Sequence, residues 1–421
     1  MRDVPPAPKE IEDLDRGDDL RAFREQFELP AGVVYLDGNS LGALPRRTRE
    51  RIATVVAREW GENLITSWNG ADWISLPQRV GDKIGALIGA AKGQVVAADS
   101  TSVNLFKVLS VALRARRGRG LIVSERANFP TDLYVIEGVV AQLGDSHELL
   151  LVEEGTEESL QAVLAERGSE VAAVVLTHVH YTTSRIHDMR RITVAAHEAG
   201  AMMVWDLSHT AGVVPVDVDG CDVDFAVGCG YKHLNGGPGA PAFIYAARRH
   251  QDRFLQPIAG WMGDARPFDF HAGYEPAEGI ARYLSGTPSV VALASLEASV
   301  ELILEAPMDA IRRKSVALGN LFVDLVDQHC GGLGLELASP REGAKRGSHV
   351  SYRHAASYPV MQALIASGVV GDCRPPDLLR FGFAPLYLRY ADIWHAVMKI
   401  ARILQAREWD QPAFRSRQRV T

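Results

Sequence analysis

Short runs of apolar residues alternate with longer amphipathic stretches between residues 120 and 250. The apolar runs are typical of strands buried on both faces, and the stretches between them have helical spacing. The pattern predicts strands at Leu121–Ser124, Leu149–Val152, Val171–Thr177, Met202–Asp206, Phe225–Gly228 and Ala242–Ala246. It predicts helices over 131–143, 157–167 and 188–199. This order is typical of an α/β fold with a largely parallel sheet.

The pattern changes toward both ends of the chain. Before residue 120 it predicts helices over 46–60 and 103–115, a short helical stripe of Leu20, Phe23 and Phe27, and a strand-like Val33–Asp37. After residue 288 it predicts helices over 289–305, 308–328, 356–367 and 391–406, and strands at His349–Arg353 and Leu378–Phe383. We therefore predict a large α/β domain over 46–305 and a smaller α+β domain formed by 1–45 and 306–421.

Composition excludes several classes of protein. Of the 421 residues, 47% are hydrophobic and 23% are charged, which is the composition of a globular protein and not of a disordered one. The net charge of −7 argues against nucleic-acid binding, which needs a basic surface. No apolar run approaches the length of a membrane span, and the N-terminus does not resemble a signal peptide. Four scattered cysteines without a C-x-x-C pair favour a reducing, cytoplasmic location.

A lysine between two glycine-rich turns is the most informative local feature. Lys232 lies in Gly228-Cys229-Gly230-Tyr231-Lys232-His233-Leu234-Asn235-Gly236-Gly237-Pro238-Gly239, directly after an apolar run. Glycines let the backbone approach a ligand closely, and a lysine held neutral condenses with carbonyl groups. Taken alone, the motif also fits an exposed loop lysine beside a turn.

An aspartate at the end of another apolar run strengthens the case for a ligand site. Asp206 ends the predicted strand at 202–206, and open α/β sheets bind ligands beyond the carboxyl ends of their strands. An acid in this place can pair with a buried cation, such as the protonated ring nitrogen of pyridoxal 5'-phosphate (PLP). The simpler alternative for Asp206 is a helix N-cap.

Two further segments carry polar groups at predicted helix starts. Asp99-Ser100-Thr101-Ser102 precedes the helix at 103–115, where hydroxyl and free N–H groups can bind a phosphate. Phe129-Pro130-Thr131-Asp132 offers an aromatic ring that can stack on a planar group. Ordinary helix caps are the alternative for both segments.

These motifs together resemble the kynureninases, PLP-dependent enzymes of the aspartate-aminotransferase fold (fold type I). The similarity runs from Tyr35-Leu-Asp-Gly-Asn-Ser-Leu-Gly to Leu379-Arg-Phe-Gly-Phe-Ala-Pro-Leu-Tyr, and its specific signals are Phe-Pro-Thr-Asp, Gly-Tyr-Lys-His-Leu-Asn-Gly-Gly-Pro-Gly and Arg-Phe-Gly-Phe. The resemblance implies a PLP-binding large domain and hydrolysis of the Cβ–Cγ bond of L-kynurenine to anthranilate and L-alanine, a step of tryptophan catabolism.

The resemblance also implies the roles of individual residues. Lys232 matches the Schiff-base lysine, Asp206 the partner of the pyridine nitrogen, and Tyr231 is the candidate acid at the substrate carbonyl. Cofactor contacts are implied at Thr101, Ser102, Phe129, Thr131, Asp132, Thr177, Asp206, His209, Tyr231, Lys232, Trp261 and Thr287. Of these, Trp261 and Thr287 match residues that reach the phosphate from the neighbouring subunit of a homodimer.

On the substrate side the resemblance assigns a carboxylate clamp and a closing loop. Arg380 matches the arginine that binds the α-carboxylate, a task suited to its planar fork, and Asn39 and Ser40 match a loop near the substrate. Trp68 falls where some relatives carry histidine against the aryl group, which favours kynurenine over 3-hydroxykynurenine. No metal site is expected, although His178-Val179-His180 resembles one, because no acid or cysteine completes a ligand set.

Two other functions fit the same motifs. Another fold-type I lyase, such as a cysteine desulfurase or selenocysteine lyase, would need a mobile, accessible cysteine, and Cys373, in a predicted loop ahead of Arg380, is the candidate. The second alternative is a PLP-fold protein that binds without turnover, although every candidate catalytic position is filled.

Overall fold

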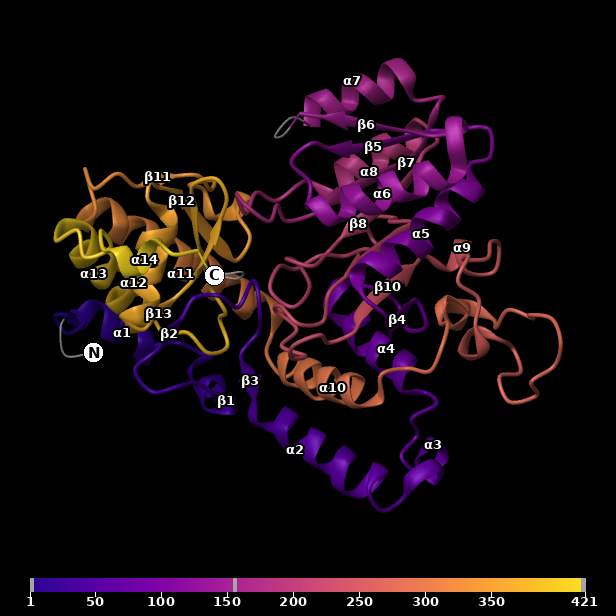
Figure 1. Ribbon diagram of the computed structural model, residues 1–421, viewed down its shortest axis with the longest axis horizontal. Helices are drawn as coiled ribbons and strands as arrows, with labels where there is room; N and C mark the ends of the chain where they lie inside the picture. Colours follow the sequence, from indigo (N-terminus) through magenta and orange to yellow (C-terminus); the bar gives the residue numbers. More distant parts are fainter. Residues whose placement is uncertain (1–3, 154–156, 418–421) are drawn as a thin grey trace.

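A seven-stranded mixed sheet forms the centre of the larger part of the molecule (Figure 1). The computed structural model describes residues 4–153 and 157–417. The strand order is β4 (Val95–Ala98), β10 (Ala242–Ala246), β9 (Phe225–Gly228), β8 (Met202–Asp206), β7 (Val171–Thr177), β5 (Leu121–Glu125) and β6 (Glu148–Val152). The pairings from β9 to β6 are parallel, whereas β10 runs antiparallel to both β9 and β4. The predicted mostly parallel sheet is therefore confirmed.

Helices cover both faces of this sheet because successive strand residues point to opposite sides. One face packs against α5 (Thr101–Ala115) and α6 (Pro130–Leu143) in one hydrophobic cluster. The other face packs against α4 (Leu76–Ile88), α7 (Glu157–Arg167), α8 (Met189–Glu198) and α10 (Val290–Leu304). The shorter helices of this part are α2 (Arg46–Thr54), which continues as a π-helix to Trp60, α3 (Ser67–Gly70) and α9 (Arg248–Gln251).

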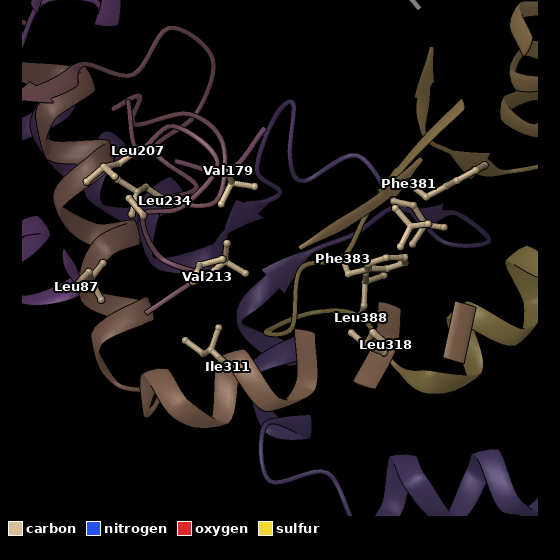
Figure 2. Packing of buried hydrophobic residues seen from close by; sticks show 14 of the residues in the cluster. Leu87, Val179, Leu207, Val213, Leu234, Ile311, Leu318, Phe381, Phe383 and Leu388 are labelled. Atoms are coloured by element: carbon tan, nitrogen blue, oxygen red, sulfur yellow. The ribbon is translucent and has the colours of Figure 1, made fainter. Parts of the chain in front are cut away.

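A second, four-stranded sheet lies in the C-terminal part of the chain. Its order is β11 (Glu336–Leu337), β12 (His349–Arg353), β15 (Leu378–Gly382) and β14 (Asp372–Arg374), with all pairings antiparallel. The accompanying helices are α11 (Met308–His329), α12 (Ser357–Ala366), α13 (Tyr390–Gln405) and α14 (Pro412–Arg415). Figure 2 shows Ile311 and Leu318 of α11 among the side chains of one continuous core, which joins the two parts of the molecule.

The N-terminal segment packs against the C-terminal part. Helix α1 (Lys9–Arg16) lies beside α13, and β2 (Val34–Tyr35) pairs in parallel with β13 (Val369–Val370). A buried ion pair of 2.7 Å joins Asp18 to Lys314 of α11. These contacts fit the predicted grouping of 1–45 with 306–421, but the division at 46–305 stays a prediction. Residues 1–3 and 418–421, at the outer ends of the predicted small domain, lie outside the described residues.

The predicted helical stripe of Leu20, Phe23 and Phe27 is wrong as a single helix. Only Arg21–Gln26 is helical, as a 3-10 turn, and Phe27 begins β1 (Phe27–Glu28), which pairs with β3 (Leu44–Pro45). The buried Phe27 ring lies 5.1 Å from that of Tyr387. Tertiary packing therefore overrides the local spacing. The strand-like segment at 33–37 is shortened to Val34–Tyr35, since the chain turns at Asp37.

Among the described residues, no helix combines the length and the apolar character needed to cross a membrane.

Candidate active site

The ends of several elements converge on one cavity of about 320 Å³. Asp206 ends β8, Lys232 follows β9, and the first residues of α5 and α6 face the same space. Parallel strands present their carboxyl ends together, which explains why residues far apart in sequence meet here. Eight of the predicted cofactor residues line the cavity: Thr101, Ser102, Phe129, Thr131, Asp132, Asp206, Tyr231 and Lys232.

The amine of Lys232 faces a buried histidine. Its Nζ lies 3.0 Å from Nε2 of His209 and 5.7 Å from the centroid of the Phe129 ring. Burial, together with the positive charge of Lys232, holds the pKa of His209 well below its ordinary value. The imidazole is therefore neutral and can share a proton with the lysine amine.

Two buried carboxyl groups share the cavity with Lys232. Asp206 Oδ1 accepts a hydrogen bond of 2.8 Å from the backbone N–H of Ser208. Burial raises the pKa of Asp206, and burial plus the charge of Asp206 raises that of Asp132. In the described part of the chain neither carboxyl group forms an ion pair, and Asp132 Oδ2 has no hydrogen-bond partner. This pair suits a cationic group in the cavity, and the protonated pyridine nitrogen of PLP is such a group.

The opposite side of the cavity suits an anion. Thr101 and Ser102 present their first-turn hydroxyl groups at the N-terminus of α5, where backbone N–H groups are free. Ser100 caps the helix by accepting a bond of 3.4 Å from Val103 N–H. The nearby acid Asp99 is held by buried Lys107 at 2.7 Å, which balances its charge. The polar groups of the cavity therefore match both ends of PLP.

Arg380 occupies the middle of the smaller sheet, between Asp372 on β14 and Ser351 on β12. Its guanidinium is buried and donates to Asp372 through Nε (2.8 Å) and Nη2 (2.5 Å), and to Ser40 Oγ at 2.8 Å. Nη1 donates to the carbonyl oxygen of Tyr181 at 2.6 Å. Asp372 thus fixes the edge of the Arg380 guanidinium that carries Nε and Nη2, and the opposite edge, which carries Nη1, points away from Asp372.

Two contacts join Arg380 to the lysine cavity. The ring of Tyr181 packs edge-on against that of Phe129, with 5.2 Å between the ring centroids. Tyr181 therefore contacts both Arg380, through its carbonyl oxygen, and Phe129 of the lysine cavity. The loop 37–42 packs on the lysine loop through a hydrogen bond of 2.8 Å from Gly42 N–H to Tyr231 O. A Cβ atom at Gly42 would lie 2.4 Å from Lys232 O, so this approach requires glycine. The loop brings Asn39, whose amide is buried and unpaired among the described residues, beside Gly382.

Besides His209, Arg380, Asn39 and Ser40, four predicted site residues do not line the cavity of this chain: Trp261, Thr287, Trp68 and Thr177. Trp261 donates to Thr287 Oγ1 at 3.3 Å, and the Trp68 ring lies 5.8 Å from that of Trp261. The exposed rings of Phe268 and Phe270 belong to the same segment. Thr177 ends β7 next to the cavity and donates its hydroxyl to Asn128. Trp261, Thr287 and Trp68 therefore form a group apart from Lys232.

Comparisons with known proteins place the chain in a family. A family model described as the kynureninase C-terminal domain matches residues 311–400. A kynureninase of Burkholderia pseudomallei is 50% identical over 412 residues, covering 97% of this chain and 98% of the relative. A kynureninase of Pseudomonas fluorescens is 48% identical over the same coverage. The chain belongs to the kynureninase family.

Solved structures confirm the predicted fold class. A cysteine desulfurase from Thermococcus onnurineus matches with a TM-score of 0.77 at 20% identity, over 91% of this chain and 98% of that one. A cysteine desulfurase from Escherichia coli matches with a TM-score of 0.76 at 20% identity, over 92% and 99%. At this identity the similarity establishes the shared fold type I architecture, and the closer sequence relatives establish the kynureninase family.

The structure corrects the expected setting of Cys373. This residue lies in strand β14 and not in a loop, and its thiol donates to the carbonyl oxygen of Ser357 at 3.4 Å. Burial raises the pKa of Cys373 to about 12. A pinned, protonated thiol is a poor nucleophile, so the desulfurase alternative is not favoured for this member of the kynureninase family.

The histidine pair that resembles a metal site has other partners. His178 Nδ1 lies 3.0 Å from Thr210 Oγ1, and His180 Nε2 lies 2.7 Å from the carbonyl oxygen of Ala127. Across residues 4–153 and 157–417, no three His, Cys, Asp or Glu side chains are grouped as a metal site.

Sequence reasoning missed several residues that complete this candidate site. Asp372 and Tyr181 hold Arg380, and Lys107 holds Asp99. The sequence does contain a signal for Asp372. Asp372 and Arg380 lie at similar distances on either side of the loop around Pro375-Pro376, so the two residues face each other across a hairpin. Tyr181 acts through its backbone carbonyl, for which side-chain chemistry gives no signal.

Proposed function

We propose that the protein hydrolyses the Cβ–Cγ bond of L-kynurenine, producing anthranilate and L-alanine in tryptophan catabolism. The observation that carries this function is the 50% identity with a kynureninase over 97% of the chain. The cavity supports it, because a lysine, a buried acid and a helix N-terminus meet where PLP would bind. When bound, PLP supplies the electron sink for breaking bonds at the substrate α-carbon.

We assign roles in the proton transfers to four side chains. Lys232 Nζ would hold PLP covalently, and its amine would accept the substrate α-proton as general base. Neutral His209, 3.0 Å away, orients this amine. Asp206 would pair with the ring nitrogen of PLP and favour its protonated form. Tyr231 is proposed as the donor to the γ-carbonyl oxygen when water adds to it, since burial raises its pKa and keeps the phenol protonated.

Steady-state kinetics with PLP-saturated enzyme test the proposed function and the preference of the enzyme for kynurenine over 3-hydroxykynurenine. We expect anthranilate release from kynurenine with a kcat/KM at least about tenfold above that for 3-hydroxykynurenine. Trp68 offers stacking area and one N–H donor but no acceptor for the hydroxyl proton. In the variant Trp68→His the preference should shrink. Release of sulfide from cysteine without anthranilate would refute the function, and an equal preference in the wild type would refute the role of Trp68.

We further propose a homodimer in which Trp261, Thr287 and Trp68 complete the site of the partner subunit. Their separation from Lys232 within one chain supports this arrangement. The exposed Phe268 and Phe270 of the same segment supply apolar surface for the contact. A cytoplasmic location stays a prediction, supported by the four free cysteines.

Mixed dimers test the shared site. Lys232→Ala subunits and Trp261→Ala/Thr287→Ala subunits, each nearly inactive alone, should recover about a quarter of wild-type activity when unfolded and refolded together, because half of the dimers are mixed and hold one intact site. Lys232→Ala mixed with Asp206→Asn is the matched control and should recover nothing, since both residues belong to the same cavity. Equal recovery in the two mixtures, or none in either, would contradict the shared site.

A further inference from the structure

Two carboxyl groups accompany Arg380: Asp372 is buried and Asp37 is half-buried. Asp372 accepts both bonds from Arg380, a bond of 2.6 Å from Ser40 Oγ, and an ion pair of 2.8 Å from Arg374. Burial raises the pKa of Asp372, but the charges of Arg380 and Arg374 outweigh burial and hold the pKa below its ordinary value. Asp372 is therefore an anion that orients Arg380.

The second carboxyl group, that of Asp37, is not engaged in this way. In the described part of the chain Asp37 forms no ion pair, and its buried Oδ1 has no hydrogen-bond partner. Burial, followed by the neighbouring charge of Asp372, raises the pKa of Asp37 to about 7, although Ser40, Arg380 and Arg374 act in the opposite direction. Leu36, the residue before Asp37, donates a bond of 2.7 Å to Val370 O and accepts one of 2.7 Å from Gly382 N–H. Leu36 therefore lies between the ends of β13 and β15, and Asp37 follows it beside the proposed clamp for the substrate carboxylate. A carboxyl group with this pKa changes charge in the neutral pH range.

We propose that Asp37 is a positioning residue whose protonation sets how strongly Arg380 holds the substrate α-carboxylate. When Asp37 is neutral, the two guanidinium groups of Arg380 and Arg374 face the single negative charge of Asp372, and one positive charge remains for the substrate. When Asp37 is ionised, the cluster is electrically neutral and attracts an anion less. This inference rests on the proposed function and on the clamp role of Arg380.

The other groups around Asp37 do not change their charge near neutral pH. Six side chains interact with the Asp37 carboxyl group. They are Ser40 of its own loop, Tyr35 of β2, Asp372 and Arg374 of β14, Arg380 of β15 and Tyr387 after β15. Burial raises the pKa of both tyrosines above their ordinary values, so they stay uncharged near neutral pH. Asp37 is thus the member of the cluster that titrates there.

The test is the pH dependence of KM for L-kynurenine, measured with wild-type holoenzyme between about pH 6 and pH 8.5. Ionisation of Asp37 removes one unit of net positive charge from the cluster and should raise the wild-type KM by about tenfold across this range. In Asp37→Asn, which cannot ionise, this rise should be absent, while the pH dependence of kcat should follow the wild type. Asp37→Glu restores an ionisable group and should restore the rise in KM.

Asp377→Asn is the matched control, because Asp377 lies just before β15 and pairs with Arg353 at 2.8 Å, away from Arg380. It should keep the wild-type profile. The proposal is overturned if Asp37→Asn keeps the wild-type rise in KM, or if the wild-type KM does not rise. A wild-type enzyme that releases no anthranilate would instead refute the proposed function, so the two failures are distinguishable. Should Asp37→Asn not fold, the uncharged Asp37→Leu carries the same prediction.

Discussion

Replacing Lys232 with alanine should lower kcat for kynurenine by about 1,000-fold or more. The variant loses the covalent attachment of the coenzyme and also the amine that accepts the α-proton. The ring contact with Phe129, the anion site at α5 and the carboxyl pair remain, so PLP should still bind, although more weakly. Anthranilate release under PLP saturation measures kcat, and the absorbance of the bound coenzyme measures occupancy.

A surface lysine provides the control for this substitution. Lys92 is exposed, and Lys92→Ala should retain wild-type kcat. A Lys232→Ala enzyme that turns over at a rate near that of the wild type would remove Lys232 from both of its proposed roles.

Replacing Arg380 with alanine should raise KM for kynurenine by about 100-fold, with a smaller effect on kcat. Two charge-assisted hydrogen bonds to the substrate carboxylate would be lost, each contributing about 1.5–3 kcal/mol. Arg380→Lys should recover only part of the affinity, because an ammonium group keeps the charge but cannot form the paired bonds.

Arg353 on the neighbouring strand β12 is the control for the clamp. It is half-exposed and pairs with Asp377 at the surface, so Arg353→Ala should change KM little. Because removing Arg380 leaves Asp372 with Arg374 as its remaining arginine, the thermal midpoint of each variant should be measured alongside. A folded Arg380→Ala enzyme with an unchanged KM would exclude Arg380 as the carboxylate clamp.

The central sheet was predictable because its strands carry continuous apolar runs. Val171–Thr177, Met202–Asp206, Phe225–Gly228 and Ala242–Ala246 have the predicted bounds, since strands buried on both faces contain few polar residues to blur their ends. Helix α4 and strand β4 were not predicted. In α4, Gly81 lowers helix propensity but is needed for packing, because a Cβ atom there would lie 2.2 Å from Val95 O of β4. Close packing between elements thus weakens the local pattern.

Most residues of the lysine cavity could be predicted because each marks the end of a strand or the start of a helix. The surroundings of Arg380 could not be predicted in the same way. Asp37 and Asp372 are far apart in sequence and meet because β2 joins β13 while β14 joins β15. The group of Trp68, Trp261 and Thr287 is likewise separated from Lys232 by the fold of one chain, a separation that residue spacing does not reveal.

Borohydride reduction of the PLP-loaded enzyme, followed by peptide mass mapping, is the most direct test of Lys232 as the residue that binds PLP. Reduction makes the bond between an amine and the coenzyme aldehyde permanent. We predict one labelled peptide, the one that contains Lys232 and follows strand β9. A label on another lysine, or no label on an enzyme saturated with PLP, would contradict the central assignment.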